Sequence, residues 1–185
     1  MLPLAFRFDD REVLVVGAGH VGIRKAQQLL DAGARVTVIA EEFLAPLPKG
    51  LVRVERRRYR SGDLRGYWLV VSATGDAITN DEIVREADDE RVWLNVVDDP
   101  ARCSFYFMAL HRQGDVTVAV TTEGAAPALA QEIRNLAAER LPTNLGEIAN
   151  TLREERRLVH ERGASTENLD WPGRIRELLS AETPS

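Results

Sequence analysis

The chain has 185 residues, of which 44% are hydrophobic and 29% charged, and its formal net charge is −5 at pH 7. This length allows a sizeable buried core, and no apolar run approaches the roughly 20 residues that a membrane-spanning helix needs. The negative charge argues against nucleic-acid binding, because neutralising phosphates requires a surplus of lysine and arginine on one face. The opening residues also lack a basic start followed by a long apolar stretch, so we expect a cytoplasmic protein without a membrane anchor.

The first half of the chain alternates strand and helix patterns. Residues 13–16 form a wholly apolar, valine-rich run, which is typical of a strand covered on both faces of a parallel sheet. The same alternation predicts further strands at 35–40, 51–55, 67–73 and 92–97, and helices at 21–32 and 80–89. This order indicates an α/β fold with a Rossmann-like, doubly wound parallel sheet.

A glycine-rich turn links the first strand to the first helix. Gly17, Gly19 and Gly22 fit the pattern G-x-G-x-x-G, in which backbone N–H groups at a helix start face a pyrophosphate and absent side chains permit close approach. Glycines mark turns in many folds, so a tight strand-to-helix turn without a ligand stays open as an alternative. The flanking strand and helix favour a dinucleotide.

Two acidic residues follow the second strand. Glu41 and Glu42 lie about 20 residues beyond the glycines, where a carboxylate accepts a hydrogen bond from a ribose 2′-hydroxyl. A 2′-phosphate would be repelled there, and no arginine lies close by in the sequence to receive it. The sequence therefore favours NAD over NADP as the cofactor.

The alternation of strands and helices ends near residue 100. Strand patterns occupy 104–113 and 115–122, and nearly everything from Pro127 onward is helical. The helical segments carry apolar stripes that need a partner surface: Leu129, Ile133, Leu136 and Ala137, then Leu145, Ile148, Ala149 and Leu152, then Trp171, Ile175, Leu178 and Leu179. We therefore expect a homodimer, with a nucleotide-binding domain at 1–108, a mixed dimerisation region at 109–142 and a helical tail at 143–185.

Several stretches together resemble a known family: "VLVVGAGHVGIRKAQQLLDAGARVTVIA", "LVVSATGD", "NVVDDPARCSF" and "TTEGAAPALAQEIR", in this order. They are similar to precorrin-2 dehydrogenase, the NAD-dependent module of siroheme synthase, over residues 1–142. The resemblance implies that a hydride passes from the tetrapyrrole precorrin-2 to NAD and a proton is lost, giving sirohydrochlorin in siroheme biosynthesis. The chain departs from the family within 121–127, where one hydroxyl is missing, and at Met108, where proline is common.

The resemblance also implies site residues. The family's important aspartate falls on Asp98, at the carboxyl end of the 92–97 strand, where ligands gather in open parallel sheets. A carboxylate there can take a proton, orient a pyrrole N–H or offer an oxygen to a metal, although the Asp-Asp-Pro sequence can also simply open a turn. By the same carry-over, residues 20–21 and 41–42 touch the cofactor and 73–74 border the nicotinamide. These cofactor residues are His20, Val21, Glu41, Glu42, Ala73 and Thr74.

Two alternatives and several simpler interpretations remain. Some relatives also insert iron as a sirohydrochlorin ferrochelatase, which would use Asp98 for both steps, and a non-catalytic NAD-sensing module is a further possibility. Cys103, the single cysteine, is interpreted as a small buried residue, and scattered histidines predict no metal site. The arginine cluster at 56–60 is a candidate for holding substrate carboxylates, but an exposed strand edge explains it more simply.

Overall fold

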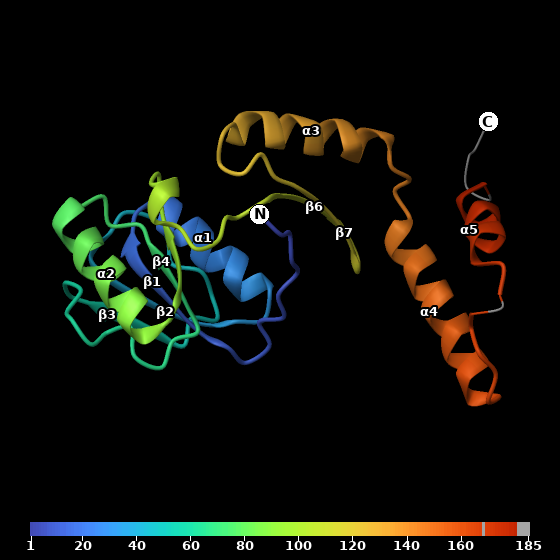
Figure 1. The fold of residues 1–185 in the computed structure, drawn as a ribbon, viewed down its shortest axis with the longest axis horizontal. Helices are drawn as coiled ribbons and strands as arrows, with labels where there is room; N and C mark the ends of the chain where they lie inside the picture. The colour runs from blue at the N-terminus through green and yellow to red at the C-terminus, as the bar shows by residue number, and fades with distance from the viewer. Residues whose placement is uncertain (168, 181–185) are drawn as a thin grey trace. The chain divides into compact units, whose positions relative to one another are not determined.

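The computed structural model describes residues 1–167 and 169–180, and these divide into two compact units, the first ending at residue 106 and the second beginning at residue 107. The first unit contains one parallel sheet in the order β3-β2-β1-β4-β5 (Figure 1). Its elements are β1 (Glu12–Ala18), α1 (His20–Asp31), β2 (Arg35–Phe43), β3 (Arg53–Arg56), β4 (Leu69–Ser72), α2 (Ala77–Glu90), β5 (Trp93–Val96) and the short 3-10 helix η1 (Pro100–Arg102). The predicted Rossmann-like, doubly wound fold is confirmed.

The two helices of this unit cover opposite faces of the sheet. The chain moves from β1 outward to β2 through α1, and in the opposite direction from β4 to β5 through α2, so right-handed crossovers place the helices on different sides. Side chains alternate accordingly along β1. Leu14 and Val16 belong to the fully buried cluster that includes Ile83 and Ala87 of α2.

The second unit is smaller in core and mostly helical. It contains the antiparallel hairpin β6 (Ala109–Gln113) and β7 (Val116–Val120), followed by α3 (Pro127–Arg140), α4 (Leu145–Glu161) and α5 (Trp171–Ser180). Helix α3 packs along both strands of the hairpin (Figure 1), and α4 contacts β7 and α5. Pro127 occupies the start of α3, as predicted. The division of this unit at residue 142 stays a prediction and falls between α3 and α4.

The predicted strand at 104–113 is only half as long in the structure. Residues 104–108 are not part of β6; instead Ser104 is fixed beside β5, where its N–H donates to the Leu94 carbonyl at 2.8 Å and its hydroxyl accepts from the Leu94 N–H at 2.7 Å. Residues 105–108 are partly buried and precede the hairpin, which begins at Ala109. Within the described ranges, no helix combines the length and hydropathy that crossing a membrane requires.

Candidate functional site

The candidate site lies at the carboxyl ends of β1 and β4. These neighbouring strands lead into turns that run in opposite directions, to α1 and to α2, so the sheet has its topological switch point between them. In open parallel sheets, ligands bind in the crevice that such diverging turns create. The glycine turn after β1 and the 73–76 turn after β4 flank this switch point, and Gly17 lies directly against Ala73.

The three glycines of the first turn differ in whether the protein's own packing requires them. Gly17 has φ +100°, and a Cβ there would lie 2.3 Å from the Ala73 carbonyl oxygen. A Cβ on Gly22 would lie 2.1 Å from the Gly17 carbonyl oxygen. Both are therefore required by the protein's own packing. Gly19 has ordinary backbone angles, φ −72° and ψ 177°, and a Cβ there would meet nothing within 4 Å.

Neither the backbone conformation nor the packing around Gly19 requires a glycine at this position. Close approach of a ligand to the backbone does explain the glycine, because the second glycine of this pattern lies against the pyrophosphate in dinucleotide-binding folds. The residues present thus fit a dinucleotide at this turn.

The start of α1 is suited to an anion. Gly19 is the N-cap residue and supplies no side-chain cap, and the first turn holds no acidic residue. The Ile23 N–H is bonded to the Gly19 carbonyl at 3.0 Å, which leaves the preceding N–H groups of His20, Val21 and Gly22 at the open end of the helix. Such a helix start attracts phosphate groups.

An irregularity in β2 brings its acidic residues to the same edge of the sheet. Val16 pairs with Ile39 and Ala18 with Phe43, so three residues of β2, 40–42, lie opposite Gly17 alone. A bulge of this kind redirects side chains at the end of a strand. Glu41 and Glu42 are both exposed at this position, beside the glycine turn.

The expectation that no arginine lies close to these glutamates is wrong. Strand β3 pairs with β2, and the chain that follows it returns past Glu41, where Arg58 Nε donates to Glu41 Oε1 at 2.8 Å. Arg56 stacks on Phe43, with its Cζ 4.6 Å from the ring centroid. Separation in sequence concealed this proximity, because it arises from strand pairing.

The exposed-edge interpretation of the arginine cluster is also wrong for Arg57. Its guanidinium is half-buried and makes two hydrogen bonds with the Asp63 carboxylate, at 2.6 and 2.9 Å, and one with Glu55 at 2.6 Å. The Asp63 carboxylate raises the pKa of Arg57 above its ordinary value. This side chain therefore fixes the loop after β3 and is not free for substrate.

The turn after β4 is held by a side chain that the sequence analysis missed. Asn80 Oδ1 accepts from the Ser72 hydroxyl at 2.6 Å and from the Thr74 hydroxyl at 3.0 Å. Asp76 caps α2 by accepting from the Thr79 N–H at 2.9 Å, and hydrogen bonds from Thr79 lower the pKa of Asp76. The Asp-x-x-Thr spacing before the helix was a readable capping signal. Ala73 and Thr74 thus lie on a rigid turn.

Asp98 lies in a tight turn directly after β5. Its φ is +61°, and the turn is closed by the Asp99 N–H donating to the Val96 carbonyl at 3.2 Å. The Asp98 side chain is exposed, and within the described ranges no hydrogen bond or ion pair is seen for its carboxylate. Asp98 is therefore part of a turn, as the simpler interpretation of the Asp-Asp-Pro sequence expects. Its carboxylate is nevertheless available to a ligand.

The residues behind Asp98 anchor that turn. Cys103 Sγ accepts from the Val96 N–H and bonds the Asp99 carbonyl, both at 3.2 Å. Burial raises the pKa of the Cys103 thiol, so this cysteine is structural and poorly suited to act as a nucleophile. Among the described residues, no group of three or more His, Cys, Asp or Glu side chains could hold a metal ion.

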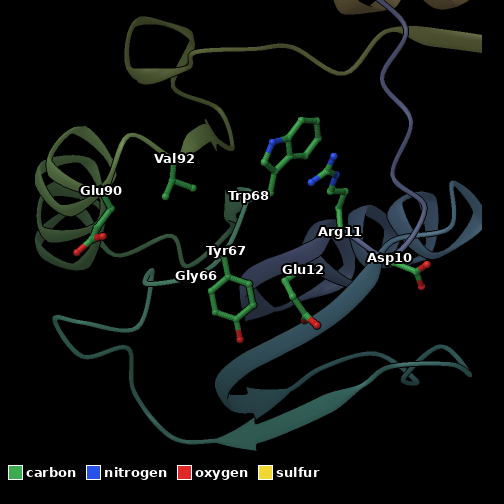
Figure 2. A pocket seen from close by; sticks show the side chains of 8 residues that line it. All are labelled: Asp10, Arg11, Glu12, Gly66, Tyr67, Trp68, Glu90 and Val92. Carbon is green, nitrogen blue, oxygen red and sulfur yellow. The ribbon is translucent and has the colours of Figure 1, made fainter.

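A cavity of about 420 Å³ lies elsewhere on this unit (Figure 2). Its lining includes Glu12 at the start of β1 and Trp68 and Val92 just before β4 and β5. Since the strands are parallel, this cavity lies at the amino ends of the strands, across the sheet from the glycine turn. Arg11 stacks on Trp68 there, with its Cζ 5.5 Å from the ring centroid, and Phe8 meets the same ring edge-on, so an aromatic cluster borders the cavity.

Comparisons with known proteins identify a nucleotide-binding family. A family model described as "Putative NAD(P)-binding" matches residues 4–109. The siroheme synthase of Tolumonas auensis is 39% identical over 163 residues, covering 87% of this chain and 35% of that protein, and that of Ectopseudomonas mendocina is 42% identical over 151 residues, covering 80% and 33%. The chain thus spans about a third of the length of these curated relatives.

A solved structure, "SirC, precorrin-2 dehydrogenase", is similar over the full length of the chain. The likeness has a TM-score of 0.74 at 26% identity and covers 100% of this chain and 90% of that one.

Proposed function

Because the chain belongs to the NAD(P)-binding family whose model covers more than half of it, we propose that it is an NAD-dependent precorrin-2 dehydrogenase. The full-length likeness to a precorrin-2 dehydrogenase and the identity to siroheme synthases support this substrate and a role in siroheme biosynthesis. The observation that carries the proposal is the open space at Gly19, above a helix start without acidic residues, in the crevice at the switch point of the sheet.

The residues around this crevice have distinct roles in the proposal. The N–H groups of His20 and Val21 hold the pyrophosphate, and Glu41 and Glu42 receive the adenosine ribose. The 73–74 turn borders the nicotinamide, and its fixed hydroxyl network keeps that wall in place. When bound, NAD supplies the hydride acceptor, and the protein contributes mainly position.

Asp98 is the proposed catalytic residue. Oxidation of precorrin-2 removes a hydride and a proton, so a group that accepts the proton is required. The exposed Asp98 carboxylate follows β5, next to β4 in the sheet, where it can take that proton or hold a pyrrole N–H. The anchoring of its turn by Cys103 supports a fixed position for this carboxylate.

We also propose that the protein acts as a homodimer. Leu129, Ile133 and Leu136 of α3 remain 52%, 42% and 48% exposed, although they share one face of an amphipathic helix. The hairpin beneath α3 has only two strands, so within the described residues each of them has one edge without a strand partner. A second copy of the same surface would cover both features by two-fold symmetry.

The proposal is tested by supplying anaerobic precorrin-2 and NAD and following the absorbance of sirohydrochlorin. We expect turnover by the wild type and none by Gly19→Val, whose side chain would fill the pyrophosphate position. Binding of NAD without oxidation would instead favour the NAD-sensing alternative. Insertion of iron or cobalt into the product by the same protein would support the bifunctional dehydrogenase and ferrochelatase.

A further inference from the structure

The acidic end of β2 is accompanied by positive charge. A carboxylate at this position normally hydrogen-bonds the ribose 2′-hydroxyl and repels a 2′-phosphate, which is how these folds exclude NADP. Here Arg58 Nε lies 2.8 Å from Glu41 Oε1, and Glu41 raises the pKa of Arg58. The carboxylate that would repel the phosphate is therefore paired with a cation from the loop after β3, and this cation can also bind a 2′-phosphate.

This ion pair can exchange partners. The Arg58 and Glu41 side chains are 81% and 55% exposed, and exposed ion pairs contribute little net free energy. A guanidinium binds phosphate with two parallel hydrogen bonds, and a phosphate offers it more charge than a carboxylate does. Arg58 would therefore lose little by turning from Glu41 to a 2′-phosphate.

A second arginine is held at the same place. Arg56 stacks on Phe43, the last residue of β2, and its Nη1 lies 3.5 Å from the Glu41 carbonyl oxygen. The ring face attracts the guanidinium and fixes its plane, and the N–H donors lie in that plane, where an anion can accept from them. The opposing acidic groups are Glu42, on the bulge, and Asp76, which acts on Arg58 across the crevice. Two arginines and three carboxylates thus surround the position of the ribose.

We propose that this nucleotide site accepts NADP as well as NAD, with Arg58 as the residue that sets the specificity. NAD remains the better ligand, because Glu41 and Glu42 can receive the 2′-hydroxyl directly. NADP enters because Arg58 leaves Glu41 and pairs with the 2′-phosphate. The inference rests on the proposed dinucleotide site at the glycine turn.

The test is the ratio of two dissociation constants, Kd for NADP over Kd for NAD, measured by calorimetry on the full chain. For the wild type we expect a ratio within about tenfold of unity, and Arg58→Ala should raise it by about tenfold, as expected for a lost charged hydrogen bond. Glu41→Gln should lower the ratio several-fold, because the repelling charge is gone. This second variant moves the ratio in the opposite direction and keeps the test informative if Arg58→Ala folds poorly.

The matched control is Arg53→Ala, which removes the same charge from the other end of β3. Arg53 pairs with Glu55 and with residue 37 of β2, at the amino end of the strands, so its loss should leave the ratio unchanged. If neither Arg58→Ala nor Glu41→Gln changes the ratio of Kd values while NAD still binds, the specificity proposal alone is overturned. Failure of the wild type to bind either nucleotide would overturn the proposed nucleotide site as well.

Discussion

The two units differ in how completely they bury their own apolar side chains. In the first unit, the strands β1, β2, β4 and β5 are covered by helices and loops, and residues such as Val13, Leu14 and Val70 are fully buried. Among the described residues of the second unit, Ala130 and Ile148 are the only buried apolar side chains, and they remain 5% and 7% exposed. The first unit can therefore fold around its own core, whereas the second needs an additional surface.

The two units therefore gain their stability from different sources: the first from its own core, and the second in part from the proposed dimer contact. Burying a leucine or isoleucine side chain contributes roughly 1.5–3 kcal/mol, so covering the three exposed residues of α3 would contribute several kcal/mol to a dimer. The first unit gains its stability without such help, which allows the turns at the carboxyl edge of the sheet to be rigid and exposed at once. Rigid, exposed turns are suited to hold ligands.

The largest expected effect comes from a residue that the first unit leaves exposed. Asp98→Ala should reduce turnover of precorrin-2 by about 10²–10⁴, because a positioned proton acceptor is lost. NAD should still raise the unfolding temperature of the variant, since Asp98 lies outside the glycine turn. The neighbouring Asp99→Asn, which alters only an exposed pair with Arg102, serves as the control and should retain turnover within about threefold. Equal turnover by wild type and Asp98→Ala would remove the catalytic assignment.

The next effect separates packing from ligand binding within the glycine turn. Gly17→Ala should lower the free energy of unfolding by about 3 kcal/mol or more, because the new Cβ meets the Ala73 carbonyl at a φ of +100°. Gly19→Ala should change it by less than about 1 kcal/mol, because space is free there. Denaturant unfolding of both variants without NAD gives the comparison, and similar losses would mean that Gly19 is also a packing glycine.

The second unit is tested through its exposed helix face. Ile133→Asp should weaken dimerisation by roughly 10–100-fold, since it places a charge in the centre of the α3 stripe. Gln131→Asp adds the same charge on the opposite face of α3 and should leave the dimer intact. Sedimentation over a range of concentrations measures both. A monomeric wild type at all concentrations would contradict the comparison of the two units.

The smallest effect concerns a lysine that the first unit partly buries. Burial, with a smaller contribution from the charge of Arg24, lowers the pKa of Lys25 from 10.5 to about 8. The unfolded chain therefore binds more protons between pH 8 and 10.5, so stability should rise with pH in this window, and the full penalty is present below pH 8. Lys25→Met should stabilise the protein by about 1 kcal/mol at pH 7, allowing for partial exposure.

Urea unfolding at pH 7 and at pH 10 measures this difference. The advantage of Lys25→Met should shrink at the higher pH, where the wild-type lysine is already neutral in the folded protein. An advantage that is equal at both pH values would show that the substitution acts through packing and not through charge.

The sheet and the glycine turn were predictable because their signals are local. Apolar runs mark the buried strands, and the spacing of Gly17, Gly19 and Gly22 marks the turn. The exposed stripe on α3 was equally readable from its helical spacing. These features depend on residues a few positions apart, and each part of the pattern supports the others.

The contacts of the 57–66 loop could not be predicted. It has no periodic pattern, yet Tyr59 donates to the buried Glu86 carboxylate of α2, which also accepts from the Gly62 and Leu64 N–H groups at 2.8 Å. Burial raises the pKa of Tyr59. The position of Arg58 beside Glu41 depends on this anchoring. Only the folded loop brings residues 17 positions apart into contact.

The central claim is that a dinucleotide lies across the carboxyl edge of the sheet, and a crystal structure of the protein with NAD tests it most directly. The account predicts pyrophosphate oxygens at about 3 Å from the N–H groups of His20 and Val21, over Gly19, with the adenosine ribose beside Glu41. Density for NAD in the cavity at the amino ends of the strands, or a crevice filled by protein side chains when NAD is present in excess, would contradict it.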